Sequence, residues 1–262
     1  MRFDPSDVPD QYDADYYVSN GQSGDRPALR WYVQMVRRYI GPGPYLDFGC
    51  GTGHLVRRLG AVGSVSGFEI SPYSVATARR TAPGCEIHTA LEEIPDGRYR
   101  GLTAVHVLEH LDDDTAADVL ACWRRVLRPG GRALVVMPDP AGKARRLAGE
   151  GWTGYQDRTH INLKPHAEWR AFLEARGFRV LREGSDGLWN VPYGRAPKLL
   201  DAGRYAVPAL AQWASGRLFL RPGRGESAVF VLESVSCPSP SPPPRCSPPP
   251  ARSASAAISP GP

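Results

Sequence analysis

One short segment, residues 45–56 with the sequence YLDFGCGTGHLV, constrains the fold of this chain more than any other. An apolar run that favours a β-strand meets three glycines at alternate positions, and an apolar segment compatible with a helix follows. Glycines tolerate positive φ and lack a Cβ, so the backbone can approach a ligand closely, and the first N–H groups of a helix favour negative charge. The segment therefore predicts a strand, a ligand-binding turn and a helix.

The spacing of the glycines discriminates between ligands. The dinucleotide fingerprint G-x-G-x-x-G would need glycine at position 54 or 56, where His54 and Val56 stand. The pattern present is G-x-G-x-G, with Asp47 two positions before Gly49. This spacing counts against a dehydrogenase. A glycine-rich turn that only lets a helix pack on a sheet remains the structural alternative.

Length and composition limit the remaining interpretations. A chain of 262 residues can bury one sizeable α/β core with appendages. It has no run of 18 apolar residues and no signal-peptide pattern, which predicts a soluble protein that is not exported. Five scattered cysteines without a C-x-x-C pair fit a reducing compartment, so we expect the cytoplasm. The net charge of +5 comes from dispersed arginines, which predicts neither a nucleic-acid nor a membrane partner.

Strand and helix signals alternate along the rest of the chain. Helices are expected at residues 27–40, 54–59, 74–80, 116–127, 165–176 and 199–218, and further strands at 65–70, 85–88, 102–107, 132–137, 178–181 and 226–235. Residues 127–131 (LRPGG) are expected to stop a helix and turn the chain. Residues 1–25 are expected to form an N-terminal arm and residues 26–235 the domain. The last 27 residues, 236–262, contain ten prolines and are expected to be disordered.

Two polar segments of the domain are candidates for substrate-facing surface. Residues 141–164 are expected to be an irregular insertion after the fifth strand, and residues 184–225, with Trp189 and Tyr193, a second one. In open α/β sheets ligands bind beyond the carboxyl ends of the strands, so the first insertion is placed where a substrate lid belongs.

The segment with Asp47, Gly49, Gly51 and Gly53 resembles the first motif of the class I S-adenosylmethionine-dependent methyltransferases. The VLEHL segment at residues 107–111 and LRPGG before a strand are similar to further family segments, although Ala90 and Arg100 stand where the family usually has acidic residues. The resemblance covers residues 12–235. It implies a doubly wound, Rossmann-like α/β fold whose seven-stranded sheet is mostly parallel with an antiparallel last strand. It also implies S-adenosylmethionine as the cofactor.

The same resemblance assigns the cofactor contacts. It places the glycine-rich turn at the methionyl part, Glu69 at the ribose, Leu91 at the adenine, and the end of the fourth strand at the methyl donor. Independently of the family, Glu69 lies at the end of a strand 16 residues after Gly53, where doubly wound folds place a ribose-binding carboxylate. A merely solvated carboxylate is the alternative. The expected cofactor residues are Asp47, Gly49, Cys50, Gly51, Gly53, Glu69, Ile70, Leu91, Ala104, Val105 and His106.

The group of methyltransferases that the chain resembles acts on ubiquinone precursors, sugars and natural products, so the resemblance implies methylation of an oxygen or nitrogen of a small molecule. A SAM-binding regulatory or scaffold module without catalysis is the competing hypothesis. His160 is the first candidate for a general base, because histidine titrates near neutral pH, and Asp157 lies in the same family-like segment. A histidine that only bridges the loop is the alternative.

Aromatic residues are the candidates for contact with the substrate. Tyr16 and Tyr17 lie in a segment similar to the N-terminal arm that covers the cofactor in related enzymes, although they could simply attach the arm to the domain. Trp152 and Tyr155 lie in the insertion. No set of Asp, Glu and His suggests a divalent metal, so the sequence predicts a metal-independent enzyme. The sequence leaves the oligomeric state open.

Overall fold

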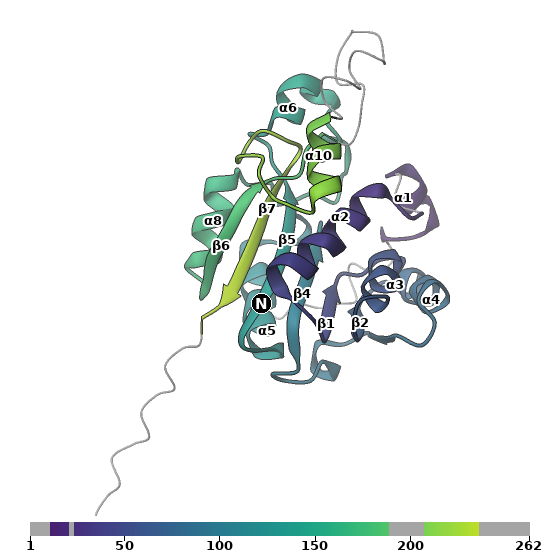
Figure 1. The fold of residues 1–262 in the computed structure, drawn as a ribbon. Helices are drawn as coiled ribbons and strands as arrows, with labels where there is room; N and C mark the ends of the chain where they lie inside the picture. Colours follow the sequence, from purple (N-terminus) through teal and green to yellow (C-terminus); the bar gives the residue numbers. More distant parts are fainter. Residues whose placement is uncertain (1–10, 21–23, 189–206, 236–262) are drawn as a thin grey trace, which may run out of the picture.

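A computed structural model describes residues 11–20, 24–188 and 207–235, and these form one seven-stranded sheet. The strand order is β3-β2-β1-β4-β5-β7-β6 (Figure 1). Neighbouring strands from β3 to β5 pair parallel, whereas β7 runs antiparallel to both β5 and β6. The predicted fold class is therefore confirmed. The strands are β1 Tyr45–Phe48, β2 Val65–Phe68, β3 Glu86–His88, β4 Tyr99–Val105, β5 Leu127–Pro138, β6 Phe178–Ser185 and β7 Ser227–Ser234.

Helices cover both faces of this sheet (Figure 1). The buried side chains of α5 and α8 pack with one face, and those of α2, α3 and α4 pack with the other. The α-helices are α1 Ala14–Ser19, α2 Pro27–Met35, α3 His54–Gly60, α4 Pro72–Thr81, α5 Asp113–Val126, α6 Lys143–Ala148, α7 Thr153–Gln156, α8 His166–Glu174 and α10 Val207–Ser215. Short non-α turns are η3 Val36–Ile40, η4 Leu91–Glu93, η5 Leu108–His110 and η6 Gly149–Gly151.

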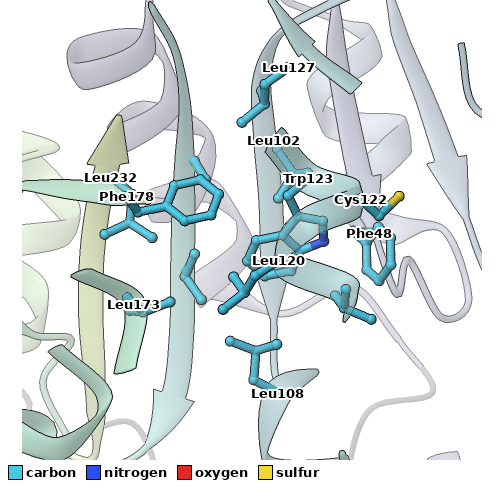
Figure 2. Packing of buried hydrophobic residues seen from close by; sticks show 14 of the residues in the cluster. Phe48, Leu102, Leu108, Leu120, Cys122, Trp123, Leu127, Leu173, Phe178 and Leu232 are labelled. Atoms are coloured by element: carbon cyan, nitrogen blue, oxygen red, sulfur yellow. The ribbon is translucent and has the colours of Figure 1, made fainter. Parts of the chain in front are cut away.

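The central strands are apolar because both of their faces are buried. Successive residues of β5 alternate between the two core clusters: Val135 packs under α5 and α8, whereas Leu134 and Val136 pack under α2 and α3. Trp123 of α5 is fully buried and meets Phe48 of β1 with ring centroids 5.6 Å apart (Figure 2). Truncating such a tryptophan to alanine costs about 3–5 kcal/mol. This core makes the strands a rigid support for the loops at their ends.

Helix starts follow their capping residues. The Ser71 hydroxyl accepts a hydrogen bond from the Ser74 N–H, and Pro72 occupies the first position of α4. Asp112 caps α5 in the same way through the Thr115 N–H. The predicted helix at residues 27–40 is present as α2 followed directly by the π-helical turn η3. In the described ranges no helix is both long and apolar enough to cross a membrane.

Two local predictions differ in part from the structure. Residues 127–131 end helix α5 as predicted, but they also belong to β5. Leu127 pairs with Tyr99 of β4 and the next pair joins Arg132 to Gly101, so residues 128–131 loop out of the ladder, with Gly130 at φ +70°. Residues 141–164 are not irregular throughout but contain α6, η6 and α7, and Trp152 is buried there against Ala144 and Leu188. The expected helix at 199–218 is described only as α10. Trp189, Tyr193 and the C-terminal tail from residue 236 lie outside the described residues.

Candidate active site

The glycine-rich turn follows β1 at the switch point of the sheet, where β2 and β4 flank β1 on opposite sides. Gly49 has φ +70° and Gly51 has φ +52°. A Cβ on Gly49 would lie 2.7 Å from Cγ2 of Val107, and one on Gly51 would lie 3.2 Å from the Tyr17 hydroxyl oxygen. Side chains are excluded at both positions for conformational and steric reasons. The predicted strand, tight turn and helix are therefore present.

Glu69 is held at the end of β2 by the turn itself. Its Oε2 accepts a hydrogen bond of 2.8 Å from the Gly51 N–H, and its Oε1 accepts bonds from the N–H groups of Ile70 and Ser71. Burial raises the pKa of Glu69, although these three bonds oppose the shift. The carboxylate is only 6% exposed, so it is not simply solvated. Its four acceptor sites leave room for a further donor, which a ribose hydroxyl could supply.

A first cavity lies over this turn. Tyr16 and Tyr17 of the arm line this cavity. Most of the predicted cofactor residues, which belong to the domain, line it as well. The arm is attached by side-chain hydrogen bonds: Ser71 Oγ donates to the Tyr12 carbonyl oxygen and Ser74 Oγ donates to the Tyr17 hydroxyl, each at 2.9 Å. The predicted cofactor residues that line this cavity are Asp47, Gly49, Cys50, Gly51, Glu69, Ile70, Val105 and His106.

Three predicted cofactor residues do not line this cavity. Gly53 faces helix α4, where a Cβ would lie 2.8 Å from the Ala78 Cα, so its small size serves helix packing. Leu91 lies in η4 and packs against the core cluster under α5. Ala104 is fully buried in β4. Gly53 was predicted from the glycine motif and Leu91 and Ala104 from the family resemblance, but the side-chain directions depend on packing.

A second cavity of about 450 Å³ adjoins the first, between α2, the insertion and the start of β7. Trp152 lines it although the side chain is almost fully buried. Tyr155, the other predicted aromatic contact, does not line it. Its ring is half exposed and stacks edge-on against Trp152 beneath the Arg145 guanidinium. His106 is the predicted residue that lines both cavities.

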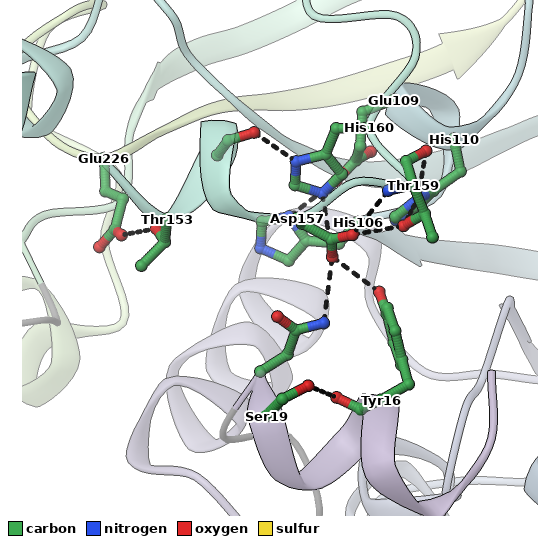
Figure 3. Close-up of polar contacts among 12 residues, drawn as sticks. Tyr16, Ser19, His106, Glu109, His110, Thr153, Asp157, Thr159, His160 and Glu226 are labelled. Carbon is green, nitrogen blue, oxygen red and sulfur yellow. Dashed lines mark hydrogen bonds and ion pairs between the residues drawn. The ribbon is translucent and has the colours of Figure 1, made fainter. Parts of the chain in front are cut away.

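Asp157 connects the N-terminal arm with the insertion. Its Oδ2 accepts hydrogen bonds from the Tyr16 hydroxyl at 2.9 Å and from the Asn20 amide at 3.1 Å, and its Oδ1 accepts one from the Thr159 N–H (Figure 3). Burial would raise the pKa of Asp157, but the bonds from Thr159 and the charge of His160 bring it below its usual value. A carboxylate with this many donors is a weak base, so the geometry favours a positioning role over the predicted catalytic one.

Three histidines gather around the buried side chain of Glu109 (Figure 3). Nδ1 of His106 lies 2.9 Å from Glu109 Oε1, and the rings of His110 and His160 have centroids 4.8 Å apart. Burial alone would raise the pKa of Glu109, but the hydrogen bond from His106 and the histidine charges hold it below its usual value. Burial lowers the pKa of His110. The cluster therefore combines a buried carboxyl group with three imidazole rings.

The sequence shows no such cluster, because Glu109 and His160 are far apart along the chain. Backbone hydrogen bonds bring them together: the N–H groups of Ile161 and Asn162 donate to the Glu109 carbonyl oxygen at 3.0 and 2.9 Å. One ligand atom from each of Glu109, His110 and His160 lies within 4.8 Å of the others. The prediction of a metal-independent enzyme rested on the sequence, in which no such set stands out, whereas the structure brings three possible ligands together.

The sequence analysis did not predict several further residues that line the cavities. Tyr12 reaches the first cavity from the arm, and Arg26 reaches it from the start of α2. His110 belongs to the VLEHL segment, whose resemblance to the family was a usable signal. Tyr32, Asp186 and Glu226 line the second cavity from three separate elements, and no local pattern links them.

The fold and the glycine-rich turn at its switch point agree with a family model described as a methyltransferase domain, which matches residues 25–183. The chain belongs to this family. It is 31% identical over 98 residues to the demethylmenaquinone methyltransferase of Chlorobaculum parvum, a match that covers 36% of this chain and 40% of that enzyme. The chain thus matches less than half the length of this curated relative.

Solved structures share the fold at low sequence identity. A SAM-dependent methyltransferase from Archaeoglobus fulgidus superposes with a TM-score of 0.57 at 16% identity, covering 85% of this chain and all of that one. The [4+2]-cyclase SpnF superposes with a TM-score of 0.58 at 18% identity, covering 88% of this chain and 97% of that one. Family membership identifies S-adenosylmethionine as the cofactor. The first cavity fits it, since Gly49 and Gly51 line the cavity and Glu69 can accept a further hydrogen bond.

Proposed function

We propose that this protein transfers the methyl group of S-adenosylmethionine to an oxygen or nitrogen of a small polar metabolite in the second cavity. One observation carries the proposal: His106 lines both cavities, so the cofactor site and the acceptor site share a wall. His106 has φ +59°, a rare conformation for a residue with a side chain. Such local strain is common where a functional geometry must be kept.

The cofactor supplies a carbon already activated by the sulfonium, so the protein contributes mainly alignment, up to about 7–11 kcal/mol when the geometry is well set. Glu69, the turn and the arm would hold the cofactor. The second cavity would hold the acceptor against His106. A relative named as a demethylmenaquinone methyltransferase supports a metabolite as acceptor.

The lining of the second cavity supports a neutral or cationic acceptor over an anionic one. Asp157, Asp186 and Glu226 contribute carboxyl groups, and Arg26 contributes one guanidinium. Burial raises the pKa of Asp186 to about 7, with the nearby charge of Glu226 acting in the same direction. A buried carboxyl of this kind can donate or accept a hydrogen bond near neutral pH. Hydroxyl- or amine-bearing metabolites match this lining.

His160 is the simplest candidate for the base that accepts the acceptor's proton. Its Nδ1 lies 2.8 Å from the Gly154 carbonyl oxygen, which leaves Nε2 as the basic atom. Replacing His160 by alanine should lower turnover about a hundredfold or more while leaving cofactor affinity unchanged. Steady-state kinetics and calorimetry on the same preparation would measure both. Equal losses of turnover and affinity would instead indicate a structural role.

The cofactor assignment is tested by calorimetric titration with S-adenosylhomocysteine and, in parallel, with NAD. We expect binding of the homocysteine compound only, and a loss of about tenfold to a hundredfold in Glu69→Ala, because a charged hydrogen-bond acceptor is removed. Glu92→Gln, at an exposed position outside the cavity, serves as the matched control. Binding of NAD, or full affinity in Glu69→Ala, would refute the proposed function.

The competing hypothesis is a SAM-binding regulatory or scaffold module without catalysis. The cyclase SpnF, which is named for a different reaction, illustrates that a similar fold does not by itself fix the function. Incubation with a panel of hydroxyl and amine metabolites, read out as formation of S-adenosylhomocysteine, separates the two hypotheses.

We also propose a cytoplasmic location, which the free thiols of Cys50, Cys85 and Cys122 in the described part of the chain support.

A further inference from the structure

We propose that Glu109, His110 and His160 bind a divalent transition-metal ion at the boundary of the two cavities. His110 lines the first cavity and His160 lines the second, so an ion held by both would face the reacting groups. The binding site itself stands on its own geometry. Only the ion's role, holding an acceptor oxygen beside the methyl group, rests on the proposed function. In that role His160 is a metal ligand and not the base.

The hydrogen bonds of the two imidazoles fix the atoms available to a metal. Nδ1 of His160 lies 2.8 Å from the Gly154 carbonyl oxygen. Nδ1 of His110 lies 3.2 Å from the Thr159 carbonyl oxygen and 2.9 Å from the Thr159 hydroxyl, whose own proton is donated to Asp157 Oδ1. All of these partners therefore accept, so each Nδ1 carries the proton and each Nε2 keeps its lone pair; Nε2 of His160 lies 3.7 Å from Asp157 Oδ2. Metal-binding histidines typically donate their other N–H to a carbonyl or carboxylate in this way.

Glu109 supplies the anionic ligand. Its side chain is fully buried, and its Oε2 has no hydrogen-bond partner among the described residues, while Oε1 is engaged by His106. Leaving such an oxygen buried without a partner is costly, by about 1–3 kcal/mol or more for a charged group. A cation between Oε2 and the two imidazoles would satisfy it. One ligand atom of each residue already lies within 4.8 Å of the other two.

The donor set selects the kind of ion. Two imidazole nitrogens and one carboxylate oxygen suit Mn²⁺, Fe²⁺, Co²⁺ or Zn²⁺, whereas Mg²⁺ and Ca²⁺ prefer sites made of oxygen. Three protein ligands leave coordination positions open. An acceptor with two adjacent oxygen atoms could occupy these positions, and a bound hydroxyl would lose its proton more readily than in water. The acceptor class that follows is a metabolite with neighbouring hydroxyl or carbonyl groups.

The test is calorimetric titration of the chelator-treated full-length protein with Mn²⁺, Co²⁺ and Zn²⁺, together with metal analysis after dialysis. We expect one equivalent to bind, and each of Glu109→Gln, His110→Ala and His160→Ala to weaken binding about a hundredfold or more, by loss of one of three ligands. His166→Gln is the matched control. His166 also pairs with a carboxylate, at 3.2 Å from Glu183, but it belongs to no group of three possible ligands within residues 11–20, 24–188 and 207–235.

A second measurement covers the case in which a variant fails to fold. Pulsed electron paramagnetic resonance of Mn²⁺ bound to the wild-type protein should show coupling to imidazole nitrogens. Stoichiometric binding without nitrogen coupling would overturn the assignment, as would retained affinity in all three variants. Absence of binding by all three ions, in protein that still binds S-adenosylhomocysteine, would also overturn it and return His160 to the role of a base.

Titration with S-adenosylhomocysteine keeps this proposal separate from the proposed function. We expect the chelated wild-type protein to bind the homocysteine compound normally, because the three proposed metal ligands do not include Glu69 or the glycine turn. Metal binding without cofactor binding would refute the proposed function and leave the metal site standing. Cofactor binding without metal binding would refute the metal site and leave the proposed function standing.

Discussion

At the scale of single residues, the structure places two carboxyl groups with different tasks beneath the first cavity. Glu69 is surrounded by backbone N–H donors, which suits a carboxylate that accepts hydrogen bonds. Asp47 has one side-chain donor, the Thr103 hydroxyl at 2.6 Å, and is 3% exposed. Burial, together with the charge of Glu69, raises the pKa of Asp47 to about 7 in spite of the bond from Thr103. Asp47 is therefore a group whose ionisation opposes folding.

The pH dependence of stability should reveal this group. Because the folded-state pKa of Asp47 is raised from 3.8 to about 7, its contribution to stability is complete below pH 3.8 and is lost as the pH rises through 7. Asp47→Asn cannot ionise, so its stability relative to the wild type should increase between pH 4 and pH 8, by about 1 kcal/mol or more. Thermal unfolding across this range measures the difference. Asp118→Asn, at an exposed position of α5, should show no such trend, and parallel curves for Asp47→Asn would contradict the assignment.

At the scale of elements, the first two helices after the glycine turn meet at Gly53. Gly53 precedes α3 with φ +81°, and a Cβ there would lie 2.8 Å from the backbone of Ala78 in α4. The third glycine of the motif thus sets the distance between two helices, whereas the first two line the first cavity.

Alanine scanning at glycines separates strain from packing. Gly84 has φ +83°, nearly the same as Gly53, but nothing lies within 4 Å of its missing Cβ. Gly84→Ala should cost about 1 kcal/mol for the left-handed conformation alone. Gly53→Ala should cost a further 1–3 kcal/mol, approximately, because the added methyl group collides with α4. Urea unfolding measures both. Equal losses in the two variants would show that α3 and α4 tolerate the methyl group.

At the scale of the whole molecule, the N-terminal arm, the insertion at residues 141–164 and the C-terminal part of the domain meet around the site. Tyr16 of the arm donates to Asp157 of the insertion, and Trp213 of α10 donates to the Pro27 carbonyl oxygen at the start of α2. The arm and the insertion lie over the carboxyl ends of the parallel strands, where the cavities are. Their order should therefore depend on an occupied first cavity more than the order of the sheet does.

Hydrogen exchange can measure this coupling. Saturating S-adenosylhomocysteine should slow amide exchange in α1, about tenfold or more, because Tyr16 and Tyr17 line the cavity that the ligand fills. Exchange in α8, which packs on the opposite part of the sheet, should not change by local contact. Exchange followed by mass spectrometry measures both peptides in one sample. Uniform slowing across the chain would show global stabilisation without ordering of the arm.

Short-range signals in the sequence determined the secondary-structure elements and the glycine turn of this protein. Alternating apolar residues, caps such as Ser71-Pro72 and the glycines at positions 49–53 predicted the sheet, the helices and the cofactor turn, because each signal acts over a few neighbouring residues. The tertiary structure decided what depends on distant pairs. It extended β5 back to Leu127 through pairing with Tyr99, gave Gly53 a packing role and placed His160 beside Glu109. Residues about 50 positions apart meet only when the whole sheet is formed, and no local pattern records which of them will meet.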